Sequence, residues 1–183
     1  MGRVITPRRI SERVFALLVV FLVAGCASDL ELGETGYRNV RHGYSIGVPG
    51  GPGPPWVRTE IEGAWLAFRR SGSETISLQS RCGKPVAHPA IMARNLVLGV
   101  GERELVQAGP VIVAGTNGWI QTFDTRSGDV GVRITTVTAV IDDCTFDWTL
   151  ATLGESPQAS RAFEIWWGTF ALDPERPEKK GRK

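Results

Sequence analysis

The stretch TNGWIQTFDTRSGDVGVRITTVTAVIDDCTFDWTLATL, residues 116–153, decides the fold. β-Branched and aromatic residues fill it, and turn residues interrupt it at 126–129 and at 142–143. Such runs between turn residues predict antiparallel strands that are joined by short hairpins. Asn117-Gly118 also has the composition of a turn, so we expect a further turn there.

The apolar positions change phase inside this stretch. Three of them share one strand phase and the next three share the other: Val130, Val132 and Ile134, then Val137, Ala139 and Ile141. A one-residue shift turns side chains to the opposite face of a sheet. Either a bulge at Thr135-Thr136 keeps both sets on one core, or this strand is buried on both faces.

Further strands are predicted upstream. Residues 64–70 and 74–82 form an expected hairpin around 71–73, with Ile76, Leu78 and Cys82 on its apolar face. A short strand at 44–48 precedes a Gly/Pro loop at 49–55. A short helix or strand is expected at 104–108, and a buried strand at 110–115.

Two helices complete the pattern. Residues 88–101 predict a helix with Pro89 at its first position and with Ile91, Met92, Asn95 and Leu98 on one side. Residues 157–171 predict a second helix, capped by Ser156. Its aromatic residues recur on one face: Phe163, Trp166, Trp167 and Phe170. This stripe either packs on the sheet as core or binds a partner or lipid.

The N-terminal segment RRISERVFALLVVFLVAGC, residues 8–26, has the composition of a signal peptide. Arginines precede an uncharged apolar run at 14–23, and small residues follow that run. A spanning helix needs roughly 20 apolar residues, which is longer than this run. A core helix is the alternative, and the all-round hydrophobicity of the segment disfavours it.

Val23-Ala24-Gly25-Cys26 resembles the lipobox of bacterial lipoproteins. The resemblance implies that the Cys26 thiol receives a diacylglyceryl group, that the chain is cut before Cys26, and that the new amine receives a fatty acid such as palmitate. Two or three acyl chains hold a protein on a membrane. Ala27, where Asp would favour the inner membrane, implies the periplasmic side of the outer membrane. An ordinary secretory signal with an incidental Cys26 is the alternative.

Cys82 and Cys144 remain once Cys26 is lipidated. An even pair of cysteines in an oxidising compartment favours a disulfide. Both residues also fall on the apolar phase of their predicted strands. We expect the disulfide, and two buried free thiols are the alternative.

Composition excludes several functions. The 183-residue chain has a net charge of +2, but residues 1–25 hold four Arg and one Glu, so the remaining 158 residues have a charge near −1. This length suits one domain. A chain without a basic excess is not expected to bind nucleic acid.

No residue pattern predicts a catalytic or metal site. His42 and His88 lack the spacing and the cysteine ligands of a zinc site. Asp142, Asp143 and Asp147 lack the alternate oxygen ligands of a calcium loop, and the first two are expected to form a turn. A Ser-His-Asp set could assemble only in three dimensions. We therefore expect no catalytic residue, no metal and no cofactor.

The order of elements predicts an α+β fold, in which an internal helix and the C-terminal aromatic helix cover an antiparallel sheet. This order resembles the PsbP-type α/β sandwich over residues 42–172, a fold that small extracytoplasmic proteins use. The expected organisation is a signal peptide at 1–25, a tether at 26–41, one globular domain at 42–172 and a disordered, charged tail at 173–183.

Two functions follow as hypotheses. One is a non-catalytic accessory lipoprotein that binds another cell-envelope protein, and the other is a carrier or sensor of a small apolar ligand or lipid. The candidate surface for either function is aromatic: Trp56, Trp65, Phe163, Trp166, Trp167 and Phe170. We expect part of this set to be exposed, because a Trp-rich stripe is rarely buried completely.

The lipobox predicts how the protein is processed. Mass spectrometry should find Cys26 as the first mature residue with acyl chains attached, because the basic start, apolar run and lipobox occur in order. Globomycin should block the cut, and Cys26→Ala should leave the protein unprocessed or released from the membrane. A mature protein that starts elsewhere, with no added mass at Cys26, would contradict lipidation.

Overall fold

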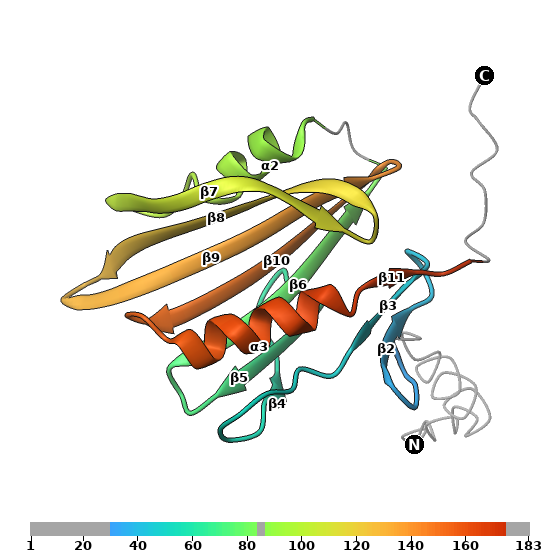
Figure 1. The fold of residues 1–183 in the computed structure, drawn as a ribbon, viewed down its shortest axis with the longest axis horizontal. Helices are drawn as coiled ribbons and strands as arrows, with labels where there is room; N and C mark the ends of the chain where they lie inside the picture. Colours follow the sequence, from blue (N-terminus) through green and yellow to red (C-terminus); the bar gives the residue numbers. More distant parts are fainter. Residues whose placement is uncertain (1–29, 84–86, 175–183) are drawn as a thin grey trace, which may run out of the picture.

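The computed structural model describes residues 30–83 and 87–174, in which two antiparallel sheets and two helices form three layers (Figure 1). The middle layer is a sheet of seven strands, in spatial order β4 (Val57–Thr59), β5 (Leu66–Arg70), β6 (Glu74–Cys82), β10 (Cys144–Leu153), β9 (Val130–Ile141), β8 (Thr116–Ser127) and β7 (Arg103–Val113). The small sheet has the order β1 (Leu30–Leu32), β2 (Gly36–Asn39), β3 (Tyr44–Gly47) and β11 (Ala171–Leu172). The helices are α2 (Pro89–Leu96) and α3 (Pro157–Gly168). The predicted α+β class is confirmed.

The two helices pack on opposite faces of the seven-stranded sheet. Gln121 of β8 donates its side-chain amide to the Ala93 carbonyl of α2, 2.8 Å away, and Gln121 pairs across the strands with Thr136. The neighbouring position Val137 points the other way, into the core that α3 and the small sheet cover. Strand β9 pairs with β8 and β10 without a register shift. There is thus no bulge at Thr135-Thr136: Val137, Ala139 and Ile141 are buried on one face, and Val132 and Ile134 are half-buried on the other.

The hairpin from β7 to β8 turns earlier than expected. Its two turn residues are Ala114 and Gly115, with φ of 46° and 78°, as a type I′ turn requires. Gly118 lies inside β8, where an added Cβ would come 2.9 Å from the Thr138 carbonyl oxygen. The predicted turn at Asn117-Gly118 is therefore wrong, since this glycine permits close packing of strands instead.

Strand β7 is one continuous edge strand, which corrects the expected short element at 104–108 and buried strand at 110–115. Most of its residues are exposed, and its register shifts between Leu105 and Gln107. Pro110 lies within it, which an edge strand tolerates because one side of its backbone has no partner strand. The apolar run at 110–115 thus predicted a strand correctly. It also predicted that this strand is buried, which is wrong.

Both helices begin as predicted, but α2 is shorter than residues 88–101. The His88 side chain accepts a hydrogen bond from the Ala90 amide, and Pro89 occupies the first turn. The predicted side does not face the sheet, since Ile91 and Leu98 are 53% and 66% exposed. Ala93 and Val97 are buried instead, and the Ala93 carbonyl accepts the hydrogen bond from Gln121 of the sheet.

The core on the α3 face is aromatic. Trp166 is completely buried, packs edge-to-face on Phe68 and donates its indole N–H to the Gly47 carbonyl at 2.9 Å. Tyr44 packs on Phe146 and Phe170, each with ring centroids 5.2 Å apart. These contacts join α3 and the small sheet to the large one.

The folded domain begins before residue 42. Residues 30–39, which we assigned to the tether, form β1 and β2, and Tyr37 of β2 packs on Phe68 at 5.6 Å. Strands of three and four residues are too short to show an alternating pattern. At the other end, the Asp173 carboxylate lies 2.9 Å from the Arg38 guanidinium, so the first residue of the assigned tail belongs to the domain. The signal peptide, Cys26 and residues 175–183 lie outside the described residues.

Cys82 and Cys144 form the expected disulfide. They face each other on β6 and β10, with Cα atoms 4.0 Å apart. The bond closes a loop of 62 residues, which contains α2 and strands β7 to β9.

Removal of this disulfide should lower the free energy of unfolding. For Cys82→Ser with Cys144→Ser we expect a loss of roughly 4 kcal/mol, because the unfolded chain gains the freedom of a long open loop. Urea denaturation followed by tryptophan fluorescence measures it. Reductant should destabilise the wild type and leave the double variant unchanged, and equal midpoints for both proteins would contradict the prediction.

Candidate functional site: an apolar groove beside helix α3

A groove of about 710 Å³ lies between α3 and the outer strands of the large sheet. Helix α3 packs against β10 and β3 and leaves part of the same face of β7, β8 and β9 open, where these strands line the groove (Figure 1). The lining residues come from β7 to β10, from α3 and from the turn before α3: Val106, Gln107, Val111, Ile120, Thr122, Arg133, Thr135, Leu150, Glu155, Pro157, Ser160, Arg161, Phe163, Glu164 and Trp167.

The floor of the groove is mostly apolar. Leu150 and Phe163 are buried, and Ile120 is partly buried against the core. The hydroxyls of Thr122 and Thr135 lie 2.9 Å apart and hydrogen-bond to each other. One hydroxyl donates to the other, so these two polar groups are partly satisfied within the protein.

Two apolar side chains form the facing rims. Val106 lies at the β7 bulge and is 48% exposed. Trp167 lies on α3 and is partly exposed, although it packs against the core. The groove is therefore open to solvent between two apolar walls.

Charged residues of both signs surround the floor and pair with one another. Arg133 donates two hydrogen bonds to the Asp124 carboxylate, at 2.8 and 2.9 Å, and also lies 3.3 Å from Glu155. These bonds hold the pKa of Asp124 below its usual range and raise the pKa of Arg133. On α3, Arg161 pairs with Glu164 at 2.9 Å.

The structure brings only two of the six predicted surface residues into this groove, Phe163 and Trp167. Trp166 and Phe170 are buried in the core, and Trp56 is buried with the Arg70 guanidinium 4.7 Å above its ring. A surface that includes these three side chains is therefore ruled out in this structure. The aromatic stripe of the C-terminal helix could be predicted from the spacing of its residues. The small sheet that helps to bury it could not.

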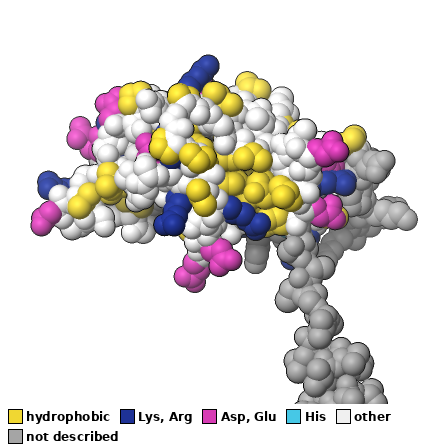
Figure 2. All heavy atoms as spheres, turned by 90° about the horizontal axis from the view of Figure 1, so that it is seen from below, with side chains coloured by type: hydrophobic (Ala, Val, Ile, Leu, Met, Phe, Trp, Pro, Cys, Tyr) yellow, Lys and Arg dark blue, Asp and Glu magenta, His cyan; other side chains and the backbone are white. Residues whose placement is uncertain are grey.

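Trp65 lies elsewhere. It packs edge-to-face on Tyr44 at 5.1 Å and lines a separate hollow of about 460 Å³ beside β4 and β5. Figure 2, which views the molecule from below, shows apolar side chains gathered in a patch, with charged side chains near its edges. The predicted aromatic surface is thus divided between two places.

Val106, Val111 and Ile120 are groove residues that sequence reasoning missed. The sequence showed them as ordinary strand residues, and Val111 was expected to be buried in a strand core. Only the position of α3 on the sheet makes them line a groove, so no local pattern could have identified them.

Two polar clusters were candidates for chemistry, and both have structural roles. His42 Nδ1 lies 2.7 Å from the Ser80 hydroxyl, which is also 3.1 Å from the Tyr44 hydroxyl. Burial raises the pKa of Tyr44. This network connects the small sheet to β6. Among residues 30–83 and 87–174, no three His, Cys, Asp or Glu side chains lie close enough together to hold a metal ion.

The second cluster surrounds Asp147 on the α2 face of β10. Its carboxylate is buried and accepts hydrogen bonds from the Thr138 hydroxyl and the Arg81 guanidinium, each at 2.8 Å. Burial raises the pKa of Asp147, and these two contacts offset that effect only in part. Arg81 is half-exposed, so water screens its charge.

Asp147 should make stability depend on pH. Because its pKa is higher in the folded protein than in the unfolded chain, stability should fall as pH rises from about 4, the ordinary Asp value, through the raised pKa. Asp147→Asn should flatten this slope in urea denaturation curves taken over a pH series. Asp129→Asn, in an exposed turn, is the control, and equal slopes for wild type and Asp147→Asn would refute the assignment.

Comparisons with known proteins identify the fold. The chain is similar to the solution structure of cyanobacterial PsbP from Synechocystis sp. PCC 6803, with 14% identity, a TM-score of 0.54 and coverage of 82% of this chain and 99% of that one. It is also similar to the Ran-binding protein Mog1p of Saccharomyces cerevisiae, with 12% identity, a TM-score of 0.52 and coverage of 75% and 95%. Such low identities show a shared fold, consistent with the PsbP-like resemblance.

A third solved structure is LpqN of Mycobacterium tuberculosis, described as involved in cell envelope biogenesis. It shares 15% identity and a TM-score of 0.49, with coverage of 72% of this chain and 83% of that one. No protein-family model and no curated protein matches the sequence.

Proposed function

We propose that this chain is a non-catalytic lipoprotein of the bacterial cell envelope, anchored through Cys26, whose domain binds another envelope protein in the α3 groove. The observation that supports binding is the open apolar floor between Val106 and Trp167. Exposed apolar patches on folded domains mark interaction surfaces. An occupant would cover both rims.

The charges favour a protein as the occupant. Arg133, Glu155, Arg161 and Glu164 place both signs around the apolar floor. An apolar centre with a polar, charged rim is the usual anatomy of a protein–protein interface. A partner segment could place apolar side chains on the floor and polar ones against this rim.

The start of the fold supports a site close to the membrane. Strand β1 begins at Leu30, four residues after Cys26. A fully extended chain of four residues spans at most about 14 Å. If Cys26 is lipidated, the domain stays next to the bilayer, and Ala27 favours the periplasmic side of the outer membrane. Restriction to one surface raises the local concentration of a partner there.

The fold is compatible with this proposal. Mog1p, which has the same fold, is described as a Ran-binding protein, so a domain of this architecture can bind another protein. A shared fold does not transfer a partner. None of the helices among the described residues is long and apolar enough to cross a membrane.

Crosslinking across the groove tests the proposal. A photo-crosslinking amino acid at position 106 of the full-length protein, activated in intact cells, should give one adduct of discrete mass with an envelope protein. Trp167→Glu should reduce that adduct roughly tenfold or more, because a tryptophan at an interface often contributes about 2 kcal/mol or more.

The matched control is on the same helix. Ile165 is 45% exposed and does not line the groove, so Ile165→Glu should leave the adduct unchanged. The absence of a discrete adduct from position 106, or equal loss with both variants, would overturn the groove as the binding site.

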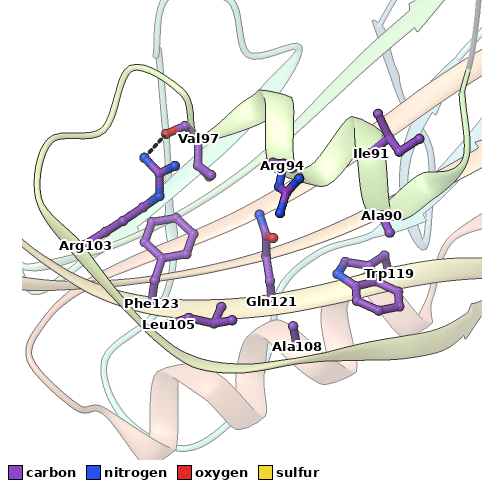
Figure 3. Close-up of a pocket in the computed structure, with 10 residues that line it drawn as sticks. All are labelled: Ala90, Ile91, Arg94, Val97, Arg103, Leu105, Ala108, Trp119, Gln121 and Phe123. Carbon is purple, nitrogen blue, oxygen red and sulfur yellow. Dashed lines mark hydrogen bonds between the residues drawn. The ribbon is translucent and has the colours of Figure 1, made fainter.

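A second function, carriage or sensing of a small apolar ligand, is favoured by a different observation. A pocket lined by apolar and aromatic residues lies on the opposite face of the sheet, beneath α2 (Figure 3).

A further inference from the structure

The pocket beneath α2 has a volume of about 550 Å³, which is within the usual range for small-molecule sites. Helix α2 forms one wall, and β7 and β8 form the floor (Figure 3). Its lining residues are Ala90, Ile91, Arg94, Val97, Arg103, Leu105, Ala108, Trp119, Gln121 and Phe123.

Two sets of hydrogen bonds fix the position of α2 on the sheet. Gln121 rises from β8 and donates to the Ala93 carbonyl at 2.8 Å. Arg103 of β7 donates to the carbonyls of Val97 and Val100, both at 2.9 Å, and its bond to Val97 is drawn in Figure 3. The helix is therefore fixed at its middle and beyond its end. The pocket lies beside these fixed points and is built into the fold.

The lining combines an apolar floor with side chains of positive charge only. Leu105, Ala108, Trp119 and Phe123 provide an apolar floor, and no carboxylate is among the lining residues. The charged lining residues are Arg94 and Arg103, both positive. This differs from the α3 groove, where acidic and basic side chains surround the floor and pair with each other.

Arg94 is the cation available to a ligand. Arg103 already donates to backbone carbonyls. Arg94 lies exposed on α2 at the pocket, and its guanidinium makes no hydrogen bond or ion pair with another described residue. A planar guanidinium binds a carboxylate with two parallel hydrogen bonds.

We propose that this pocket binds a free fatty acid or a similar single-chain carboxylate. The acyl chain lies on Leu105, Ala108 and Trp119, and the carboxylate accepts hydrogen bonds from Arg94. Leu105 and Ile91, which are 63% and 53% exposed, would lose contact with water when the chain is bound. The proposal deepens the ligand-binding alternative and uses a different face from the α3 groove, so either site can fail without the other.

Photolabelling of the full-length protein in isolated membranes tests this site. The probe is decanoic acid with a diazirine in its chain and a terminal alkyne, compared with the corresponding alcohol and trimethylammonium compounds. The carboxylate should label peptides from α2 and β7. The alcohol should label them less, and the cationic compound should label them least.

Three variants separate the pocket from general membrane partitioning. Ala108→Trp fills the pocket from an exposed strand position and should abolish labelling. Arg94→Glu should reduce labelling roughly tenfold or more, because it removes the charge-assisted hydrogen bonds and places a negative charge beside the carboxylate, and Arg94→Lys should retain most of it. Arg69→Glu, at an exposed position of β5 that lines neither the pocket nor the groove, is the control and should label like the wild type.

Folding of each variant is checked by the oxidised state of Cys82 and Cys144 and by resistance to protease. Labelling that is equal for all three headgroups, that spreads over exposed peptides, or that survives both Ala108→Trp and Arg94→Glu would overturn the proposal. If Ala108→Trp does not fold, the comparison of Arg94→Glu with Arg94→Lys decides the result.

Discussion

The arrangement of the layers depends on the indole of Trp166. This side chain is fully buried, its ring packs on Phe68 of β5, and its N–H donates to the Gly47 carbonyl of β3. One residue of α3 therefore contacts both sheets at once. Because the helix is held over the β5–β10 side of the large sheet, part of the same face of β7–β9 stays open as the groove. The position of the α3 groove therefore follows from the contacts of Trp166 with Phe68 and with the Gly47 carbonyl.

The large sheet presents two different surfaces, because two different kinds of contact hold its covers. Aromatic packing seats α3 and the small sheet tightly on one face. On the other face, side-chain hydrogen bonds to backbone carbonyls hold the short helix α2, in which Ala93 is buried. The first face leaves an open groove with paired charges of both signs, which suits a protein surface. The second leaves a pocket with only positive charges, which suits an anionic amphiphile.

Where the sequence misled, a non-local contact was responsible. Gly118 looked like part of a turn, but its lack of a side chain is needed beside the Thr138 carbonyl. Residues Gly36–Asn39 were assigned to the tether, but they form a strand whose Tyr37 packs on Phe68 of a distant strand. Trp56 and Phe170 looked like surface candidates, and the second layer buries them. In each case the deciding atom belongs to a residue far away in the chain.

By itself the sequence determined what local patterns can encode: the long strands at 116–153, the hairpin before them, the helix starts at Pro89 and Pro157, and the shared apolar phase of Cys82 and Cys144. Periodicity, caps and turn residues act over a few neighbours, so these features need no tertiary information. Which face each helix covers, which aromatic side chains stay accessible, and which residues meet around the groove and the pocket were decided only by the tertiary structure. Those properties depend on how the layers pack, because a side chain is buried only where a helix or sheet of another layer covers it.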